Sequence, residues 1–256
     1  MNAHAFEQRN KSLIKEMAAD TRVRAATETW IHAVLPYEYN YHFSWLGVPV
    51  IQFPPDVLAM QELVWRIQPD VLIETGVARG GSLIFYASLL RLIGKGGQVV
   101  GVDIDIREEN REIITRHPLS EGITLIEGSS TDDDVVVRVA DVVGDKGVVM
   151  VVLDSKHTHE HVLAELHRYS AFVTEGSYIV VFDTIIEDLT VPQNPDRPWG
   201  KGNSPKTAVV EFLAENHEFV IDKDIEDKLL ITGAPDGFLR RRSVKSKRDY
   251  DGESRV

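Results

Sequence analysis

Residues 71–82 read Val71-Leu-Ile-Glu74-Thr-Gly76-Val-Ala78-Arg-Gly80-Gly81-Ser82 and say more about this chain than any other stretch. Three apolar residues lead to an acid, a glycine-rich segment follows, and the apolar run Leu83-Ile-Phe-Tyr-Ala-Ser-Leu-Leu comes next. This pattern predicts a buried strand, a tight turn and a helix. Glycines let the backbone approach a ligand closely, and a helix start offers free N–H groups. The stretch therefore predicts a ligand-binding junction, with an ordinary packing junction as the alternative.

The acid Glu74 indicates which ligand the junction would accept. A carboxylate at the end of the strand would repel a phosphate group. The stretch also has neither the lysine of a P-loop nor the full G-x-G-x-x-G spacing of a dinucleotide site. A carboxylate suits a ligand with a positive amino group, such as the methionine part of S-adenosylmethionine.

Composition narrows the class of protein. The chain has 256 residues, enough for one large α/β domain or two small ones. Its 28 Lys+Arg against 40 Asp+Glu give a formal charge of -12, which argues against general nucleic-acid binding. Without cysteine, neither disulfides nor thiolate chemistry is available. The first residues lack the regions of a signal peptide, and no run approaches the ~18 apolar residues of a membrane helix. We expect a cytoplasmic protein with no membrane span.

After residue 70 the chain alternates between strand-like and helix-like segments. Strands are expected at 71–74, 98–103, 123–127, 148–153, 177–182, 218–222 and 228–232. The segment Val148-Val-Met-Val-Val-Leu153 is apolar throughout, as expected for a strand covered on both faces. The pattern predicts an α/β fold with a doubly wound, mostly parallel seven-stranded sheet. The last two strands would form an antiparallel hairpin at one edge.

The remaining segments suggest how the chain is divided. Residues 1–55 are expected to form a helical and aromatic N-terminal cap, residues 56–240 the α/β domain, and residues 241–256 a charged, disordered tail. Pro54-Pro55-Asp56 predicts the start of a helix, and residues 191–206, rich in Pro, Gly and Asn, predict a long loop. The aromatic segment 37–45 either lines a pocket or packs the cap against the main domain.

Polar residues follow most of the predicted strands, at the edge of the sheet where ligands bind in open α/β folds. Asp103 ends the second strand, where an acid can accept the ribose hydroxyls of a nucleoside. Gly128-Ser129-Ser130 follows the third strand and offers small polar groups suited to the edge of an adenine.

Two further acids, Asp154 and Asp183, end the fourth and fifth strands and could share a Mg²⁺ ion, which prefers hard oxygen ligands. Clustered carboxylates repel one another unless a cation lies among them or some stay protonated. The alternative is ordinary, since Asp is common after strands as a turn or cap residue. Taken singly, His157, His159 and His161 are expected to be solvated helix residues.

Together these motifs resemble those of the class I methyltransferases. More closely, they resemble the cephalosporin hydroxylase-like group, which includes rhamnosyl and macrolide-sugar O-methyltransferases. The likeness covers roughly residues 40 to 240, and its most specific part is Asp154-Ser-Lys-His157-Thr-His159-Glu-His161-Val-Leu163. It implies a Mg²⁺-assisted, S-adenosylmethionine-dependent O-methyltransferase. The acceptor would be a hydroxyl of a sugar, such as a rhamnosyl unit, in natural-product or polysaccharide biosynthesis. Self-association through the N-terminal cap is a further expectation.

The resemblance also implies roles for individual residues. His157 would be the general base, and Trp199 with Tyr37, Tyr39 and Tyr41 would cover an apolar sugar face. Relatives often carry a Glu-Asp pair after the fifth strand, whereas Phe182 takes the first place here, so the third metal ligand would be Thr184, a water or absent. Mg²⁺ would be held by Asp154, Asp183 and Thr184. S-adenosylmethionine would be surrounded by Glu74, Gly76, Ala78, Gly80, Ser82, Asp103, Ser129, Ser130 and Asp154.

Three other functions compete with this one. The nearest is the same enzyme class acting on a hydroxylated antibiotic nucleus or a phenol. An NAD-dependent oxidoreductase fits Asp103 but fits neither Glu74 nor the missing G-x-G-x-x-G spacing. A non-catalytic binding module that kept a cofactor pocket is the third, because fold alone does not fix function.

Overall fold

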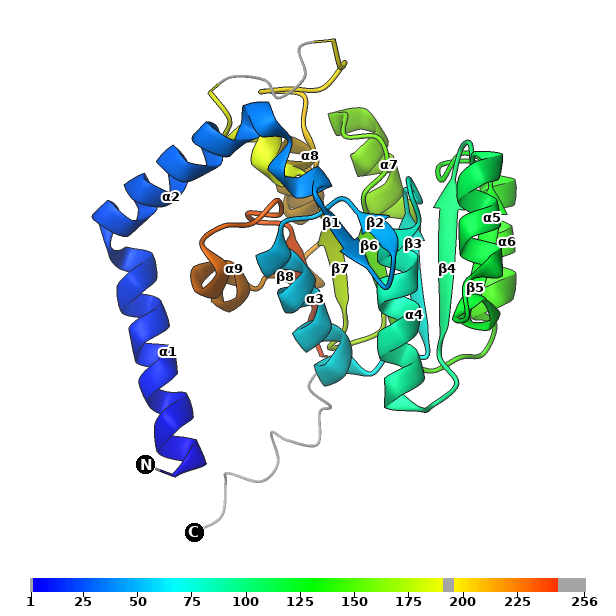
Figure 1. Ribbon diagram of the computed structural model, residues 1–256, viewed down its shortest axis with the longest axis horizontal. Coiled ribbons are helices and arrows are strands. Elements are labelled where there is room, and N and C mark those ends of the chain that lie inside the picture. Colours follow the sequence, from blue (N-terminus) through cyan, green and yellow to red (C-terminus); the bar gives the residue numbers. More distant parts are fainter. Residues whose placement is uncertain (1, 191–195, 244–256) are drawn as a thin grey trace.

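The centre of the molecule is a twisted seven-stranded sheet with helices on both faces (Figure 1). The computed structural model describes residues 2–190 and 196–243. The strand order is β5-β4-β3-β6-β7-β9-β8, in which β3 to β7 are parallel and β9 is antiparallel to both of its neighbours. The predicted doubly wound, mostly parallel sheet is confirmed. The strands are β3 Val71–Thr75, β4 Gln98–Asp103, β5 Ile123–Glu127, β6 Val149–Leu153, β7 Tyr178–Val181, β8 Phe219–Ile221 and β9 Phe238–Arg241.

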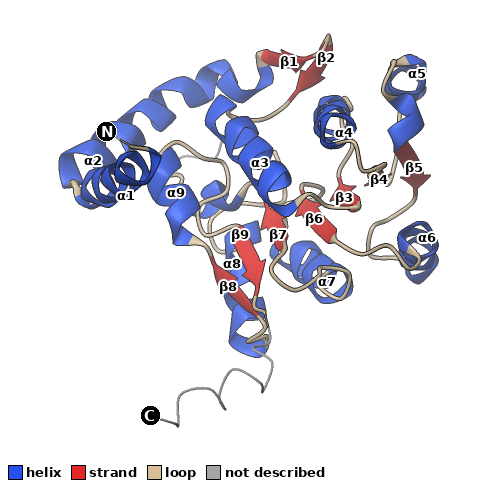
Figure 2. Cartoon of the chain, turned by 90° about the horizontal axis from the view of Figure 1, so that it is seen from below, coloured by secondary structure: helices blue, strands red, loops and turns tan. Residues whose placement is uncertain are grey.

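Two layers of helices cover the sheet (Figure 2). One layer contains α3 Pro54–Ile67, α4 Gly81–Ile93 and α5 Glu108–Arg116, and the other contains α6 Asp133–Val143, α7 His159–Tyr169 and α8 Pro205–Glu215. Successive strand residues alternate between two apolar clusters, as Leu72 faces the first layer and Ile73 the second. The strands are apolar throughout because both of their faces are buried.

The last strand differs from the prediction. Residues 228–232 are not a strand, since α9 Lys223–Leu229 includes the first two of them, residues 230–232 are irregular, and the seventh strand is β9. Ile225 and Leu229 are four residues apart, so both point to one side of α9 and pack in the cluster beneath α3. The β-like run Leu230-Ile-Thr follows the helix without forming a strand, because Leu230 has φ +58° and leaves the extended conformation. The hairpin expected between 218–222 and 228–232 is not formed; β8 pairs antiparallel with β9 instead, and the connection between them contains α9.

The N-terminal region lies beside and over the sheet domain (Figure 1). Helices α1 Ala3–Ala19 and α2 Thr21–Val34 form an arm, and the short turns Leu35–Tyr37 and Tyr39–Tyr41 lead into a hairpin of β1 Phe43–Trp45 and β2 Val48–Val50. The hairpin packs on α4, where the indole N–H of Trp45 donates to the Ser88 hydroxyl at 3.1 Å. Among the helices described, none is long and apolar enough to cross a membrane.

Two predicted irregular segments are described only in part. Residues 191–195 of the predicted loop and 244–256 of the predicted tail lie outside the described residues. The rest of the loop is held together by a bridge between Gly200 and Asn203, and α8 begins at Pro205. Helix α3 begins at Pro54, as predicted.

The strand order places the functional region. The chain reverses direction across the sheet between β3 and β6, because β4 and β5 lie on one side of β3 and β6 and β7 on the other. A crevice forms outside the carboxyl ends of such strands. The turns after β3, β4, β6 and β7 all face this crevice.

Candidate active site

The glycine-rich turn between β3 and α4 is shaped by contact with the protein itself. Gly76 has φ +92° and Gly80 has φ +84°, conformations that favour glycine. A Cβ on Gly76 would lie 2.0 Å from the carbonyl oxygen of Asp154, and one on Gly81 would lie 2.1 Å from that of Pro49. From the sequence, these glycines were expected to let the backbone approach a ligand. In the structure, the neighbouring backbone of β6 and β2 already requires them.

The predicted residue Glu74 is fully buried at the end of β3. One carboxylate oxygen, Oε2, accepts a hydrogen bond from the Ser82 hydroxyl at 2.7 Å. The other, Oε1, has no hydrogen-bond partner among the described residues. Burial raises the pKa of Glu74 to about 8, although the bond from Ser82 opposes this shift. The side chain is therefore a buried acid with one acceptor oxygen still available.

Asp103 holds the glycine-rich turn in place. Its Oδ2 accepts hydrogen bonds from the backbone N–H groups of Val77 at 2.8 Å and Ala78 at 3.3 Å. Its Oδ1 accepts from the N–H of Asp105 at 3.2 Å. The carboxylate thus joins the ends of β3 and β4 at the crevice. Its expected contact with a ribose stays a prediction.

A segment that the sequence did not indicate closes over the turn. Residues 49–52, at the end of the N-terminal hairpin, leave a cavity of only about 30 Å³ beside Gly76 to Ser82 and Asp154. The side-chain amide of Gln52 donates to Oδ2 of Asp154 at 2.9 Å. No motif around Gln52 suggests this contact, because it joins residues far apart in the chain.

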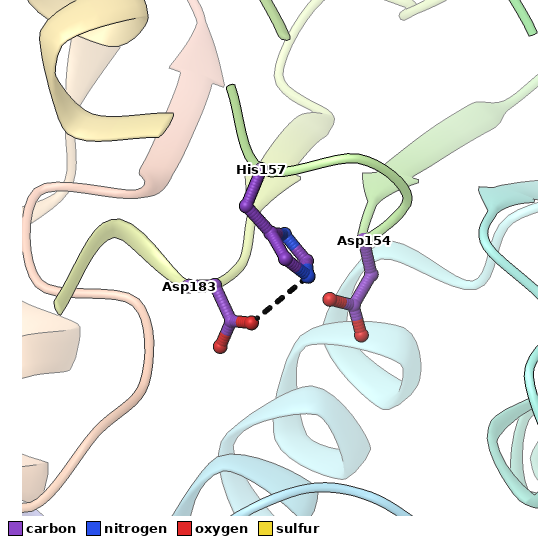
Figure 3. A group of neighbouring side chains, drawn as sticks. All are labelled: Asp154, His157 and Asp183. Carbon is purple, nitrogen blue, oxygen red and sulfur yellow. Dashed lines mark ion pairs between the residues drawn. The ribbon is translucent and has the colours of Figure 1, made fainter. Parts of the chain in front are cut away.

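Three side chains meet at the ends of β6 and β7 (Figure 3). One ligand-type atom from each of Asp154, His157 and Asp183 lies within 4.8 Å of the other two. His157 Nε2 is 3.1 Å from Oδ2 of Asp183. Burial and the nearby carboxylate of Asp183 raise the pKa of Asp154 well above its usual range. The sequence placed the two acids together; the structure adds the imidazole to the same cluster.

Thr184, the other predicted metal ligand, directs its hydroxyl hydrogen to a neighbouring loop. It is fully buried, and its hydroxyl donates to the carbonyl oxygen of Pro235 at 2.7 Å. The hydroxyl is thus already used to hold a neighbouring loop, and His157 is the third side chain beside the two acids. Phe182 is also buried, in the apolar cluster under α3. This position therefore belongs to the core of the domain.

A larger cavity opens next to the three-residue cluster. It has a volume of about 540 Å³ and is lined by Tyr41, Ser155, His157, Asp183 and Trp199, together with Arg197 and Lys201. The Trp199 ring meets the His157 ring edge to face, with centroids 4.8 Å apart. Of the three tyrosines expected here, Tyr41 lines the cavity, Tyr37 is largely exposed, and Tyr39 packs against Trp30 and Phe53.

Of the remaining predicted residues, Ser130 and His161 belong to a buried network. The Ser130 hydroxyl donates to Oε1 of Glu165 at 2.6 Å, and His161 Nε2 lies 3.2 Å from the same hydroxyl. The Ser129 hydroxyl is 3.0 Å from that of Thr131. The sequence left His161 as structural or solvated, and the structure gives it the structural role, since its side chain is only 17% exposed and its Nε2 lies in this network. Glu165 lies in an apolar helix stretch where no local pattern marks it.

His159 has a different environment from the other two histidines. Its Nδ1 lies 2.8 Å from the Thr207 hydroxyl on α8, and its Nε2 lies 3.2 Å from Glu211. It therefore links α7 to α8 on the side away from the three-residue cluster.

Comparisons with known proteins agree with this geometry. A family model described as rhamnosyl O-methyltransferase/CmcI matches residues 37–242. The rhamnosyl O-methyltransferase of Mycobacterium tuberculosis is 29% identical over 200 residues, covering 77% of this chain and 78% of the relative. That of Mycobacterium leprae is 29% identical over 202 residues, covering 78% and 83%. A solved CmcI structure described with Mg and SAM has a TM-score of 0.57 and 19% identity, covering 79% of this chain and 78% of that one. The fold is that of a class I methyltransferase.

Proposed function

The chain belongs to the rhamnosyl O-methyltransferase/CmcI family, and from this premise we propose that it transfers a methyl group from S-adenosylmethionine to a sugar hydroxyl with the help of Mg²⁺. The observation that carries the proposal is the cluster of Asp154, His157 and Asp183 beside a buried acid-and-glycine turn. A rhamnosyl unit is the acceptor that the relatives' names favour, and we propose a role in natural-product or polysaccharide biosynthesis.

The residues of the turn suit the methionine end of the cofactor. Glu74 Oε1 is buried without a partner among the described side chains, so an ammonium group would supply the missing hydrogen bond and opposite charge. Asp103 would accept ribose hydroxyls in addition to, or in place of, its present bonds from the backbone of the turn. The cavity of about 30 Å³ is smaller than the cofactor, so residues 49–52 must move when it binds.

The three-residue cluster suits a divalent cation. Two carboxylates and an imidazole converge, and the raised pKa of Asp154 reflects a repulsion that a cation would relieve. Asp154 and Asp183 would hold Mg²⁺, with waters completing its coordination in place of the engaged Thr184. With both groups bound, the site would gain a Lewis acid that lowers the pKa of a hydroxyl and an electrophilic methyl group.

The chain's own residues would then move the proton and position the acceptor. His157 faces the large cavity, where a neutral imidazole can take a hydroxyl proton, and the edge contact with Trp199 fixes its ring. Trp199 and Tyr41 would cover one face of the sugar. Methyl transfer needs oxygen, carbon and sulfur in line, so this positioning contributes directly to rate.

A chelator experiment tests the proposal. We expect the protein to methylate a rhamnoside when S-adenosylmethionine and Mg²⁺ are supplied, to lose activity in excess chelator, and to regain it when Mg²⁺ is restored. Mass spectrometry of the acceptor measures the gain of one methyl group. Full activity in chelator, or in the Asp154→Ala/Asp183→Ala double variant, would refute the metal role.

The same assay separates the acceptor classes. A phenol is acidic enough to need the general base less than a sugar hydroxyl does. His157→Ala should therefore lose far more activity on a sugar than on a phenol, and preferred turnover of phenols would point to the non-sugar alternative. Binding of NAD in place of S-adenosylmethionine would point to an oxidoreductase. Cofactor binding without turnover of any acceptor would point to a binding module.

Two further proposals concern the molecule in the cell. Self-association through the N-terminal arm is supported by the half-exposed Phe6 and Leu13 on α1, and light scattering of the wild-type chain against a Phe6→Glu/Leu13→Glu variant would test it. The expected cytoplasmic location stays a prediction that cell fractionation would test.

A further inference from the structure

A single buried oxygen joins two turns of the active site. Oε1 of Glu165, on α7, accepts hydrogen bonds from the Ser130 hydroxyl at 2.6 Å and from the Ser155 hydroxyl at 2.7 Å. Ser130 belongs to the adenine-side turn, residues 128–130 after β5. Ser155 belongs to the metal-side turn, residues 154–157 after β6. Glu165 is 0% exposed, so this bridge is shielded from water.

The two turns have no direct sheet contact. Strand β5 is separated from β6 by β4 and β3 in the strand order, so ladder hydrogen bonds do not set one turn relative to the other. Helix α7 packs on the sheet through Val162, Leu166 and Tyr169, which fix the place of Glu165. The Glu165 carboxylate therefore fixes the position of one turn relative to the other, which the sheet itself does not do.

The hydrogens of this network can be assigned. Each serine hydroxyl has one hydrogen, and both hydrogens are used toward Oε1 of Glu165. His161 Nε2 lies 3.2 Å from the Ser130 oxygen and 3.1 Å from the Ser155 oxygen. It must then carry the hydrogen and donate to the serine oxygens. His161 thus bridges the same two hydroxyls as Glu165.

A purely structural role does not account for a buried carboxylate here. Burying a carboxylate is costly, and an apolar residue would pack on the sheet without that cost. Oε2 of Glu165 also lacks a partner within the described part of the chain, so the network is incompletely satisfied. The presence of the Glu165 carboxylate beside the crevice therefore indicates a benefit other than stability.

We propose that Glu165 and His161 are positioning residues that hold the adenine-side and metal-side turns in one arrangement, so that the cofactor and the metal bind in the correct positions relative to each other. The inference rests on the proposed function. Ser155 stands between Asp154 and His157, so its bond to Glu165 orients the metal-side turn. Ser130 acts in the same way for the adenine-side turn, since its hydroxyl donates its hydrogen to Glu165 and not to the adenine.

Binding measurements test this without the acceptor. S-adenosylhomocysteine is titrated by calorimetry, and Mn²⁺, as a paramagnetic substitute for Mg²⁺, is titrated by electron paramagnetic resonance. Ser130→Ala should weaken S-adenosylhomocysteine about tenfold and leave Mn²⁺ nearly unchanged. Ser155→Ala should do the reverse. Glu165→Ala should weaken both, and Glu165→Gln, which keeps the acceptor oxygen, should restore most of both affinities.

The control is Glu160→Ala, which removes an exposed carboxylate from the same helix and should change neither affinity. A Glu165→Ala variant that lowers only the melting temperature, with both dissociation constants unchanged, would overturn the positioning role. If that variant does not fold, equal effects of Ser130→Ala and Ser155→Ala on one ligand would overturn it. A wild-type chain that binds neither probe would instead overturn the proposed function.

Discussion

The two halves of the crevice are built in different ways. The cofactor half, around the turn after β3, is packed closely, with a cavity of about 30 Å³. The acceptor half, beside His157, contains a cavity of about 540 Å³. The first is lined by the turn and the adjoining segment 49–52. The second is lined by side chains from the N-terminal region, the β6 and β7 turns and the loop before α8.

This contrast predicts that the cofactor half tolerates fewer substitutions than the acceptor half. In the cofactor half, backbone lies against backbone, as at Gly76 and Asp154, so most side chains larger than hydrogen are excluded. In the acceptor half, side chains on loops line an open space, and loops tolerate substitution. We therefore expect changes to the two halves to have separable effects on stability, cofactor binding and acceptor use.

The largest expected effect is on turnover and belongs to the acceptor half. His157→Ala should lower kcat on a sugar acceptor by ~10²–10⁴-fold, the usual loss when a general base is removed. Affinity for S-adenosylmethionine should stay nearly unchanged, because the imidazole faces the large cavity. Steady-state kinetics at saturating Mg²⁺ and cofactor calorimetry measure the two quantities.

His159→Ala is the matched control, since this imidazole joins α7 to α8 instead of facing the cavity. His161 is unsuitable as a control, because it belongs to the buried network with Glu165. Near wild-type kcat in His157→Ala would show that the base lies elsewhere. A loss that excess Mg²⁺ repairs would assign His157 to metal binding instead.

The next effect, on stability, belongs to the cofactor half. Gly76→Ala places a Cβ 2.0 Å from the Asp154 carbonyl oxygen in a backbone conformation of φ +92°. We expect a loss of roughly 1–2 kcal/mol from the left-handed backbone and a further ~1–3 kcal/mol from overpacking. Urea denaturation measures the free energy of unfolding of the variant and of the wild type.

Gly94→Ala separates these two contributions. Gly94 has φ +75°, and nothing lies within 4 Å of the position its Cβ would take. This variant should therefore show only the backbone cost of roughly 1–2 kcal/mol. Equal losses of unfolding free energy in Gly76→Ala and Gly94→Ala would mean that the glycine-rich turn moves away from β6 to make room for the Cβ. The close packing of the cofactor half would then not constrain the turn.

The same contrast limits what the sequence could predict. The first six strands follow from apolar runs ending in acids or small polar residues, because strand burial and strand ends are local properties. The strand expected at 228–232 was wrong because its first two residues belong to α9, whose Ile225 and Leu229 pack beneath α3, and Leu230 at φ +58° then leaves the extended conformation. Local patterns cannot include that partner.

Within the site, the acids Asp154 and Asp183 were predictable from their positions after neighbouring parallel strands. Gln52 and Glu165 were not, since each meets its partner only through the tertiary fold. Thr184 was a candidate by adjacency to Asp183, but it follows a residue with φ +57° and its hydroxyl faces Pro235. Sequence neighbours need not point into the same cavity where the backbone turns sharply.

A smaller effect is expected from the wall of the acceptor half. Trp199→Ala removes the ring that packs on His157 and lies beneath the Arg197 guanidinium, which is 5.1 Å from the ring centroid. Loss of one aromatic wall should raise the acceptor KM about tenfold, in line with more than 1 kcal/mol for such contacts. Trp65→Ala, an exposed position on α3, is the control. Weaker cofactor binding in Trp199→Ala would contradict the expectation that changes in the acceptor half leave the cofactor half unaffected.

The last expected effect is a pH dependence from Glu74. Burial raises its pKa from 4.5 to about 8, so between these values the folded protein binds a proton that the unfolded chain does not. Its contribution to stability is complete below pH 4.5 and is lost as the pH rises through 8. Glu74→Gln stays neutral, so its free energy of unfolding should fall less than that of the wild type between pH 5 and pH 8. Urea denaturation across this range measures the difference.

Binding of a cationic amino group should ionise Glu74, so at pH 7 the wild type should release close to one proton when it binds S-adenosylmethionine, and Glu74→Gln should release none. Calorimetry in two buffers of different ionisation enthalpy counts that proton, and its absence in the wild type would place the cofactor's amino group away from Glu74.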